Sequence, residues 1–110
     1  MKAFTLSCLA LSLAACQSIP PDEQQAANPA QGLILARNSC SECHQVRRNG
    51  ESPNPDAPPF ATIANREGLT AEGLSTWLRD SHNYPVEMGL YLDQHQVDAL
   101  VAYMIRLRSQ

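Results

Sequence analysis

Two cysteines and a histidine stand close together in the chain, in the order Cys40-Ser41-Glu42-Cys43-His44. Two thiols at this spacing can add across the vinyl groups of a haem, and a histidine that follows at once can bind the iron through Nε2. The motif therefore predicts covalent attachment of one haem c through Cys40 and Cys43, with His44 as the proximal iron ligand.

The same cysteine pair could in principle serve other chemistry. A redox dithiol of the thioredoxin type needs a βαβ context, which this sequence lacks. A structural zinc site needs about four ligands, and no second cysteine pair follows the leader. A disulfide between residues three positions apart closes too small a loop to stabilise the fold much. Haem attachment is the interpretation that fits the sequence.

The first fifteen residues predict a signal peptide rather than part of the fold. Lys2 is followed by an uncharged, mostly apolar run over residues 3–15, which is too short to span a bilayer. The run ends in Leu13-Ala14-Ala15-Cys16, which resembles the lipobox of bacterial lipoproteins. We therefore expect acylation of Cys16 and permanent membrane anchoring. An ordinary secretory signal, cut near the same place, is the alternative.

Residues 16–27 are predicted to be a flexible tether, because they are rich in Gln, Ala, Pro and acidic residues without apolar periodicity. The tether would hold a domain over residues 28–110 on the periplasmic side of the membrane. Gln17 stands where an Asp would resemble an inner-membrane retention signal, which favours the outer membrane. Loss of Lys2 changes the net charge from −3 to −4, and an acidic surface makes nucleic acid a poor partner.

The remaining sequence predicts an all-α domain with three main helices joined by loops. The first helix covers about residues 29–38, has Pro29 near its start and leads directly to Cys40. The second begins at the N-cap Thr70 and closes at Asp80 and Ser81. Residues 49–59, crowded with Pro, Asn and Gly, are predicted to form a loop.

The third helix has the clearest signals. Asp93 is followed three positions later by Gln96, which is close to a capping box. Apolar residues then recur at helical spacing: Val97, Leu100, Val101, Met104 and Ile105. Aromatic residues make up 5% of this 110-residue chain, so a buried cofactor would supply apolar volume that the core lacks.

From about Gly32 to Leu107 the chain resembles the class I cytochrome c domain family, which implies a small cytochrome c fold around one haem. Gly32 matches the small residue at which the family's first helix crosses its last, and Tyr103 matches the aromatic that packs there. Pro58-Pro59-Phe60 resembles the family loop whose proline carbonyl, here Pro58, accepts the Nδ1 proton of the proximal histidine. A generic stiff loop is the alternative for these prolines.

The family pattern also places a methionine, the sixth iron ligand, between the second and third helices. Met88 is the match, since Met1 leaves with the leader and Met104 falls on the apolar face of the last helix. The sequence departs from the pattern at Pro85, which stands three positions ahead of Met88 rather than beside it. His82 is the rival ligand and would give a lower reduction potential; a solvated loop histidine is the expectation we favour.

Four further residues carry weaker expectations. Trp77 is predicted to line the haem pocket or the core, and His95, in the first turn of the last helix, is expected to be exposed. Arg47 and Arg48 follow the haem motif and are expected to be a solvated pair rather than a binding surface for an acidic partner.

With both axial positions filled, the domain would be a one-electron carrier between exported redox proteins, not an enzyme, and would need no small-molecule substrate. The alternative is a haem-based sensor of NO, CO or peroxide, which requires an open or labile sixth position and distal acid–base groups. Near Met88 the sequence offers Glu87 and His82 for that purpose. A dedicated cytochrome subunit of a redox enzyme is a third possibility.

Overall fold

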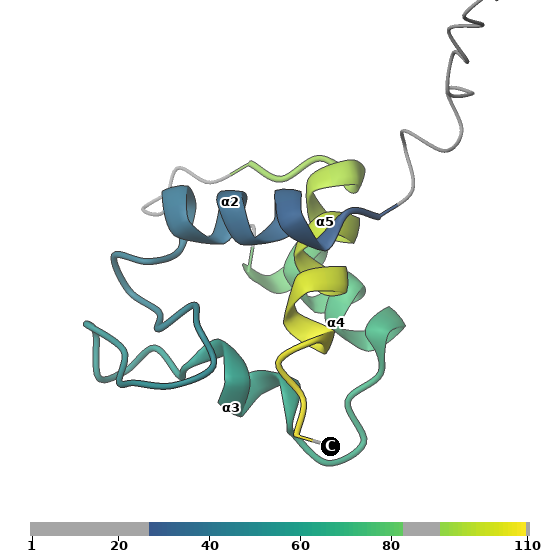
Figure 1. Ribbon diagram of the computed structural model, residues 1–110. Coiled ribbons are helices and arrows are strands. Elements are labelled where there is room, and N and C mark those ends of the chain that lie inside the picture. Colours follow the sequence, from purple (N-terminus) through teal and green to yellow (C-terminus); the bar gives the residue numbers. More distant parts are fainter. Residues whose placement is uncertain (1–26, 83–90, 110) are drawn as a thin grey trace, which may run out of the picture.

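The computed structural model describes residues 27–82 and 91–109, and within these residues every regular element is helical (Figure 1). The elements are α2 (Pro29–Ser39), α3 (Phe60–Ala64), α4 (Ala71–Trp77), the π-helical turn η1 (Leu78–His82) and α5 (Gln94–Ile105). The prediction of an all-α fold is confirmed. None of these helices has the length and hydropathy that crossing a membrane requires.

Some of the predicted features lie outside the described residues. These are the signal peptide over residues 1–15, the acylated Cys16, nearly all of the tether over residues 16–27, and the distal ligand Met88. They remain predictions.

Helix α2 leads directly into the cysteine motif. Asn28 caps its start, because the Asn28 side chain accepts a hydrogen bond from the amide of Ala30 at 2.9 Å. At the other end the amide of Cys40 donates to the carbonyl oxygen of Ala36 at 2.9 Å, and the amide of His44 donates to the carbonyl oxygen of Cys40 at 2.8 Å. The motif therefore forms a tight turn that continues from the end of the helix.

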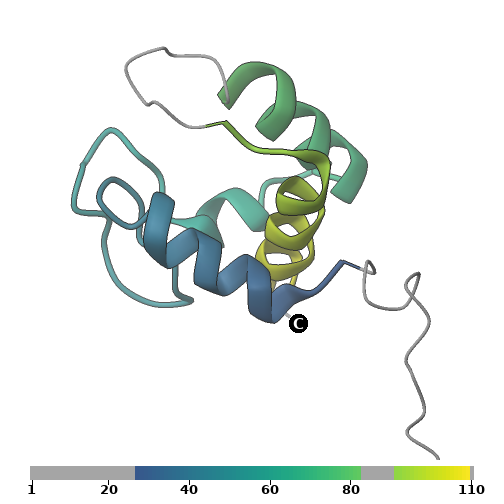
Figure 2. The ribbon, with the colours of Figure 1, turned by 90° about the horizontal axis from the view of Figure 1, so that it is seen from above.

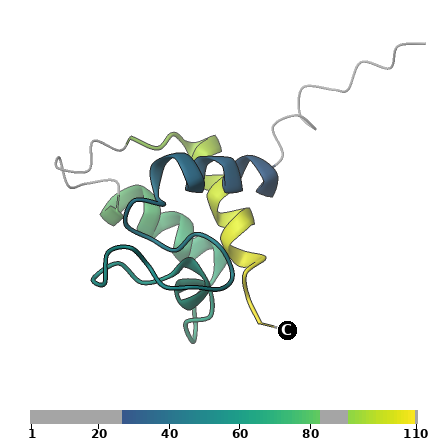
Figure 3. The same cartoon turned by 60° about the vertical axis from the view of Figure 1, so that its left-hand side comes forward.

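Helix α2 crosses α5 (Figures 1 and 3), and Gly32 lies at the crossing. A Cβ atom on Gly32 would stand 2.6 Å from the carbonyl carbon of Ala99 and 2.8 Å from the Cβ atom of Tyr103, and it would also overlap the carbonyl oxygen of Ala99. The backbones can approach this closely because Gly32 has no side chain. The crossing that the family resemblance implied, with Tyr103 packed against it, is present.

Helix α5 is the central element of the fold and contacts both α2 and α4, which lie on either side of it (Figure 2). Its capping box is complete: Asp93 accepts from the amide of Gln96 at 2.9 Å, and Gln96 accepts from the amide of Asp93 at 3.0 Å. The predicted apolar face is buried at Val97, Leu100, Val101 and Met104. Met104 is 1% exposed, so its role in the core is confirmed.

Helix α4 begins where the sequence predicts and ends differently. The hydroxyl of Thr70 accepts from the amide of Gly73 at 2.9 Å and caps the helix. The α-helical geometry stops at Trp77, before the predicted end at Asp80 and Ser81, and the chain continues as the π-helical turn η1 through His82. The predicted end of this helix is therefore wrong. The residues that indicate the end of a helix do not distinguish an α-helix from a π-helical turn.

Helix α3 was not predicted. It follows the predicted loop and is only five residues long, with Phe60, Ile63 and Ala64 buried in the core. Isolated helices this short are unstable in water, so burial of its apolar residues rather than local propensity accounts for it. Arg108 holds its end, since the guanidinium donates to the carbonyl oxygen of Ala64 at 2.9 Å.

Arg48 joins the segment after the cysteine motif to the three residues that follow α5. Its guanidinium donates to the carbonyl oxygens of Arg106 at 2.7 Å, Leu107 at 3.2 Å and Arg108 at 3.3 Å. Nearby, the hydroxyl of Tyr103 donates to the carbonyl oxygen of Val46 at 2.7 Å. Arg47 and Arg48 are both exposed, as expected of a solvated pair, and Arg48 in addition binds the carbonyls of the three residues that follow α5.

Replacement of Gly32 tests the crossing. We expect Gly32→Ala to lower the free energy of unfolding by about 2 kcal/mol, because the new methyl group forces the two helices apart. Chemical denaturation of the holoprotein measures the change. The exposed neighbour Gln31 provides the control, and Gln31→Ala should change the free energy of unfolding by less than about 0.5 kcal/mol. Equal effects of the two substitutions would contradict the importance of the crossing.

Candidate haem site

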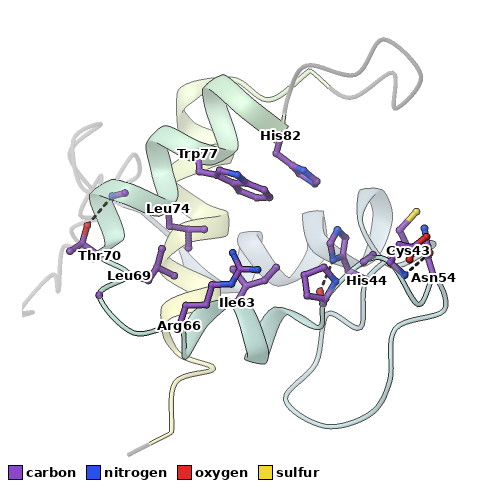
Figure 4. Close-up of a pocket in the computed structure, with 15 residues that line it drawn as sticks. Cys43, His44, Asn54, Ile63, Arg66, Leu69, Thr70, Leu74, Trp77 and His82 are labelled. Carbon is purple, nitrogen blue, oxygen red and sulfur yellow. Dashed lines mark hydrogen bonds between the residues drawn. The ribbon is translucent and has the colours of Figure 1, made fainter.

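A cavity of about 610 Å³ opens beside the cysteine motif, between the loop that follows it, α3 and α4 (Figure 4). Its volume lies within the range of about 300–1,000 Å³ that is typical of cofactor and ligand sites. Most of the wall is apolar, from Ala57, Pro58, Ile63, Leu69, Leu74 and Trp77. Such a wall suits a large, flat, mostly apolar group.

The two cysteines line two different hollows. Cys43 is exposed and lines the large cavity, whereas Cys40 is half-buried and lines a smaller adjoining hollow. Both spaces share His44, His82 and Trp77. Both cysteines are free thiols, and burial, with a smaller contribution from Cys43, raises the pKa of the Cys40 thiol to about 11.

His44 is the most constrained polar residue of the site. It is 7% exposed, and its Nδ1 lies 2.8 Å from the carbonyl oxygen of Pro58. Since a carbonyl oxygen can only accept, Nδ1 carries the proton and Nε2 of the neutral ring keeps a free lone pair. The ring of Phe60 packs against it with centroids 5.4 Å apart. The His44 ring is thus fixed in tautomer and in orientation.

The contact between Pro58 and His44 that the family resemblance implied is therefore present in the structure. It is formed by residues fourteen positions apart. The amide of Phe60 also donates to the carbonyl oxygen of Gln45 at 2.9 Å, so the loop that carries Pro58 is held against the residue after His44. The role of His44 as an iron ligand remains a prediction.

His82 lies across the cavity from His44 (Figure 4). The centroids of the two imidazole rings are 5.7 Å apart, with an angle of 70° between the planes. His82 also stacks on Trp77, with centroids 4.5 Å apart and planes 17° from parallel. Burial, and less strongly the neighbouring His44, lowers the pKa of His82. The expectation of a solvated loop histidine is wrong, because His82 is half-buried in η1.

The other aromatic and histidine predictions have clear outcomes. Trp77 lines the cavity as expected, although it is 39% exposed. His95 is exposed on α5, which confirms its prediction.

Arg66 is a residue of the site that the sequence did not reveal. It follows α3 and its side chain lines the large cavity (Figure 4). A guanidinium at the edge of an apolar cavity can pair with a carboxylate of a bound group. A haem carries both a flat apolar ring and carboxylates, so the cavity, the thiols, the free Nε2 of His44 and Arg66 together fit it.

These features define a haem c-binding domain, and comparison with known proteins gives the same class. The Cytochrome c family profile matches residues 29–108. The chain is also 31% identical over 101 residues to cytochrome c-552 of Bradyrhizobium diazoefficiens, a match that covers 92% of this chain and 91% of that protein. No solved structure gave a significant match.

The chain therefore belongs to the cytochrome c family. Proteins of this family carry electrons with a covalently bound haem c, and one haem is consistent with a single small domain. The prediction of one covalent haem c as cofactor is confirmed at the level of the family.

Substitution of the two cysteines tests the attachment. We expect the double variant Cys40→Ser, Cys43→Ser to lose covalently bound haem, because no thioether can form. Haem staining of the denatured protein after electrophoresis measures this. Ser41→Ala, within the same motif, should retain covalent haem. Covalent haem at the wild-type level in the double variant would refute the attachment.

Proposed function

We propose that this protein is a one-electron carrier on the periplasmic side of a bacterial membrane. Its single haem c is attached to Cys40 and Cys43, and the iron is bound by His44 and Met88. The observation that carries the proposal is the buried ring of His44, whose Nδ1 donates to the carbonyl oxygen of Pro58, so that Nε2 is free to bind a metal. When bound, the haem supplies a one-electron redox couple.

His44 would contribute more than a bond to the iron. Its hydrogen bond to the carbonyl oxygen of Pro58 raises the basicity of Nε2 and fixes the ring plane. Burial by Phe60 and Ile63 keeps water away from the ring. A ligand held in this way changes little in position when the charge of the iron changes, which favours rapid electron transfer over ligand chemistry.

Met88 is the proposed sixth ligand on the strength of its place in the sequence, after η1 and before α5. A thioether ligand opposite a histidine raises the reduction potential of haem iron. With Met88 bound, the iron has no open position, and the protein needs neither substrate nor catalytic acid.

The alternative function, sensing of NO, CO or peroxide, needs distal groups that exchange protons with the ligand. The cavity is lined by the ionisable residues Asp56, Arg66 and His82. Between described residues, no hydrogen bond or ion pair connects His82 with Asp56 or Arg66. This lack of a connected acid–base group favours the carrier.

The proposed partners are exported redox proteins that meet the carrier in brief encounters, for which a contact area below about 1,200 Å² is sufficient. The thiol of Cys43 is exposed at the cavity, so a haem edge attached there would be accessible to such partners. A dedicated cytochrome subunit of one redox enzyme would use the same residues.

The absorption spectrum of the holoprotein tests the carrier proposal. We expect the ferric protein to be low-spin with the weak long-wavelength band of sulfur-ligated haem, because Met88 is bound. We also expect the ferrous spectrum to be unchanged by CO. Rapid CO binding together with absence of the sulfur band would contradict the carrier and favour a ligand sensor.

The proposed membrane anchor rests on Cys16. We expect Cys16→Ser to abolish fatty-acid labelling and to prevent anchoring of the exported protein, because the acylated thiol is lost. Metabolic labelling with a fatty acid and fractionation of membranes measure both effects. Cys8→Ser, a change within the predicted leader, should leave labelling intact. A Cys16→Ser protein that is still labelled would refute the anchor.

A further inference from the structure

We propose that His82 is a second distal ligand, which binds the haem iron in place of Met88 whenever Met88 is detached. This rests on the proposed function, because it assumes an iron bound by His44. The exchange would replace a sulfur ligand by a ring nitrogen of His82. Both ligands are neutral, so the step requires no proton, electron or additional reactant.

The first observation is the distance between the two imidazoles. Metal–imidazole bonds of about 2 Å place the centroids of two rings on opposite sides of one metal ion about 6 Å apart. The centroids of His44 and His82 are 5.7 Å apart. The rings point toward one another across the space that both cavities share (Figure 4). His82 is therefore close enough to His44 for one iron atom between the two rings to bind both.

The second observation is the helix type that puts His82 there. In an α-helix, residues five positions apart point about 140° away from each other. The wider π-helical turn, with its i→i+5 hydrogen bonding, brings such residues to the same side. Trp77 and His82 are five positions apart, and they stack at 4.5 Å because η1 is π-helical. Trp77 is thus a positioning residue that holds the His82 ring toward the cavity.

The third observation concerns competing ligands. The sequence has three histidines, and Lys2, its one lysine, belongs to the predicted leader. Apart from His44, the histidines are therefore His82 at the cavity and His95, which is exposed on α5. The exchange would keep the iron six-coordinate and closed to small ligands. It would also lower the reduction potential, because a histidine replaces a thioether.

Three variants of the full-length holoprotein test the proposal: Met88→Ala alone, Met88→Ala with His82→Ala, and Met88→Ala with His95→Ala as the matched control. The spin state of the ferric protein and the rate of CO binding to the ferrous protein are measured at several protein concentrations. We expect Met88→Ala and the His95 control to remain low-spin with two nitrogen ligands at every concentration. The His82 double variant should become high-spin and bind CO at least about tenfold faster.

A high-spin Met88→Ala protein, or a CO rate that His82→Ala does not change, would overturn the role of His82. A low-spin state that disappears on dilution would also overturn it, because the ligand would come from another molecule. Each of these three results leaves the proposed carrier function intact if the wild-type protein has covalent haem and the sulfur band. A wild-type protein without covalent haem would overturn the carrier as well. Covalent haem content and helical circular dichroism of each variant verify that it is folded.

Discussion

The rest of the structure depends on the crossing of α2 over α5 at Gly32. The absence of a side chain there lets the backbone of α2 rest directly on Ala99 and Tyr103 of α5. Helix α2 leads into the cysteine motif, while α5 supplies Leu100 and Met104 to the wall behind His44. This one contact therefore fixes the position of the cysteine motif, which carries predicted haem ligands. It also fixes the α5 surface against which the motif packs.

Two hydrogen-bonded links extend this constraint to the residues after His44. The hydroxyl of Tyr103 donates to the carbonyl oxygen of Val46, and the guanidinium of Arg48 donates to the carbonyl oxygens of the three residues that follow α5. These carbonyls lie just beyond the negative end of the α5 dipole, so the guanidinium supplies both hydrogen-bond donors and a favourable positive charge. The cysteine motif is thus held to α5 on both sides, through α2 before it and through Arg48 after it.

The sequence predicted those parts of the fold that local interactions determine. The caps at Thr70 and Asp93 depend on residues within one helical turn, and both are present. Helix α3 has too few residues to produce a periodic pattern, and its formation depends on burial against distant elements. The partners of Arg48 lie almost sixty positions away in the chain, so nothing near Arg48 could indicate them.

The residues of the haem site divide in the same way, into those that the local sequence indicates and those that depend on distant parts of the chain. The cysteines and His44 could be recognised because covalent attachment and proximal ligation require adjacent residues. Pro58 was found only through the family resemblance, since a backbone carbonyl leaves no mark in the residue type. Arg66 and the orientation of His82 were missed. The spacing rules used for helices assume α-helical geometry, and under those rules Trp77 and His82 point in different directions.

The two sides of the cavity differ in how firmly their histidines are held, and this difference bears on function. His44 is fixed by the Pro58 carbonyl, by the backbone bond to Cys40 and by Phe60. His82 is held by stacking on Trp77 at the end of a π-helical turn, a helix type that is often found at functional sites. Stacking restrains the plane of a ring but not its movement within that plane. A carrier built in this way would keep one axial ligand constant while allowing a choice of ligand on the opposite side, and the choice would set its reduction potential.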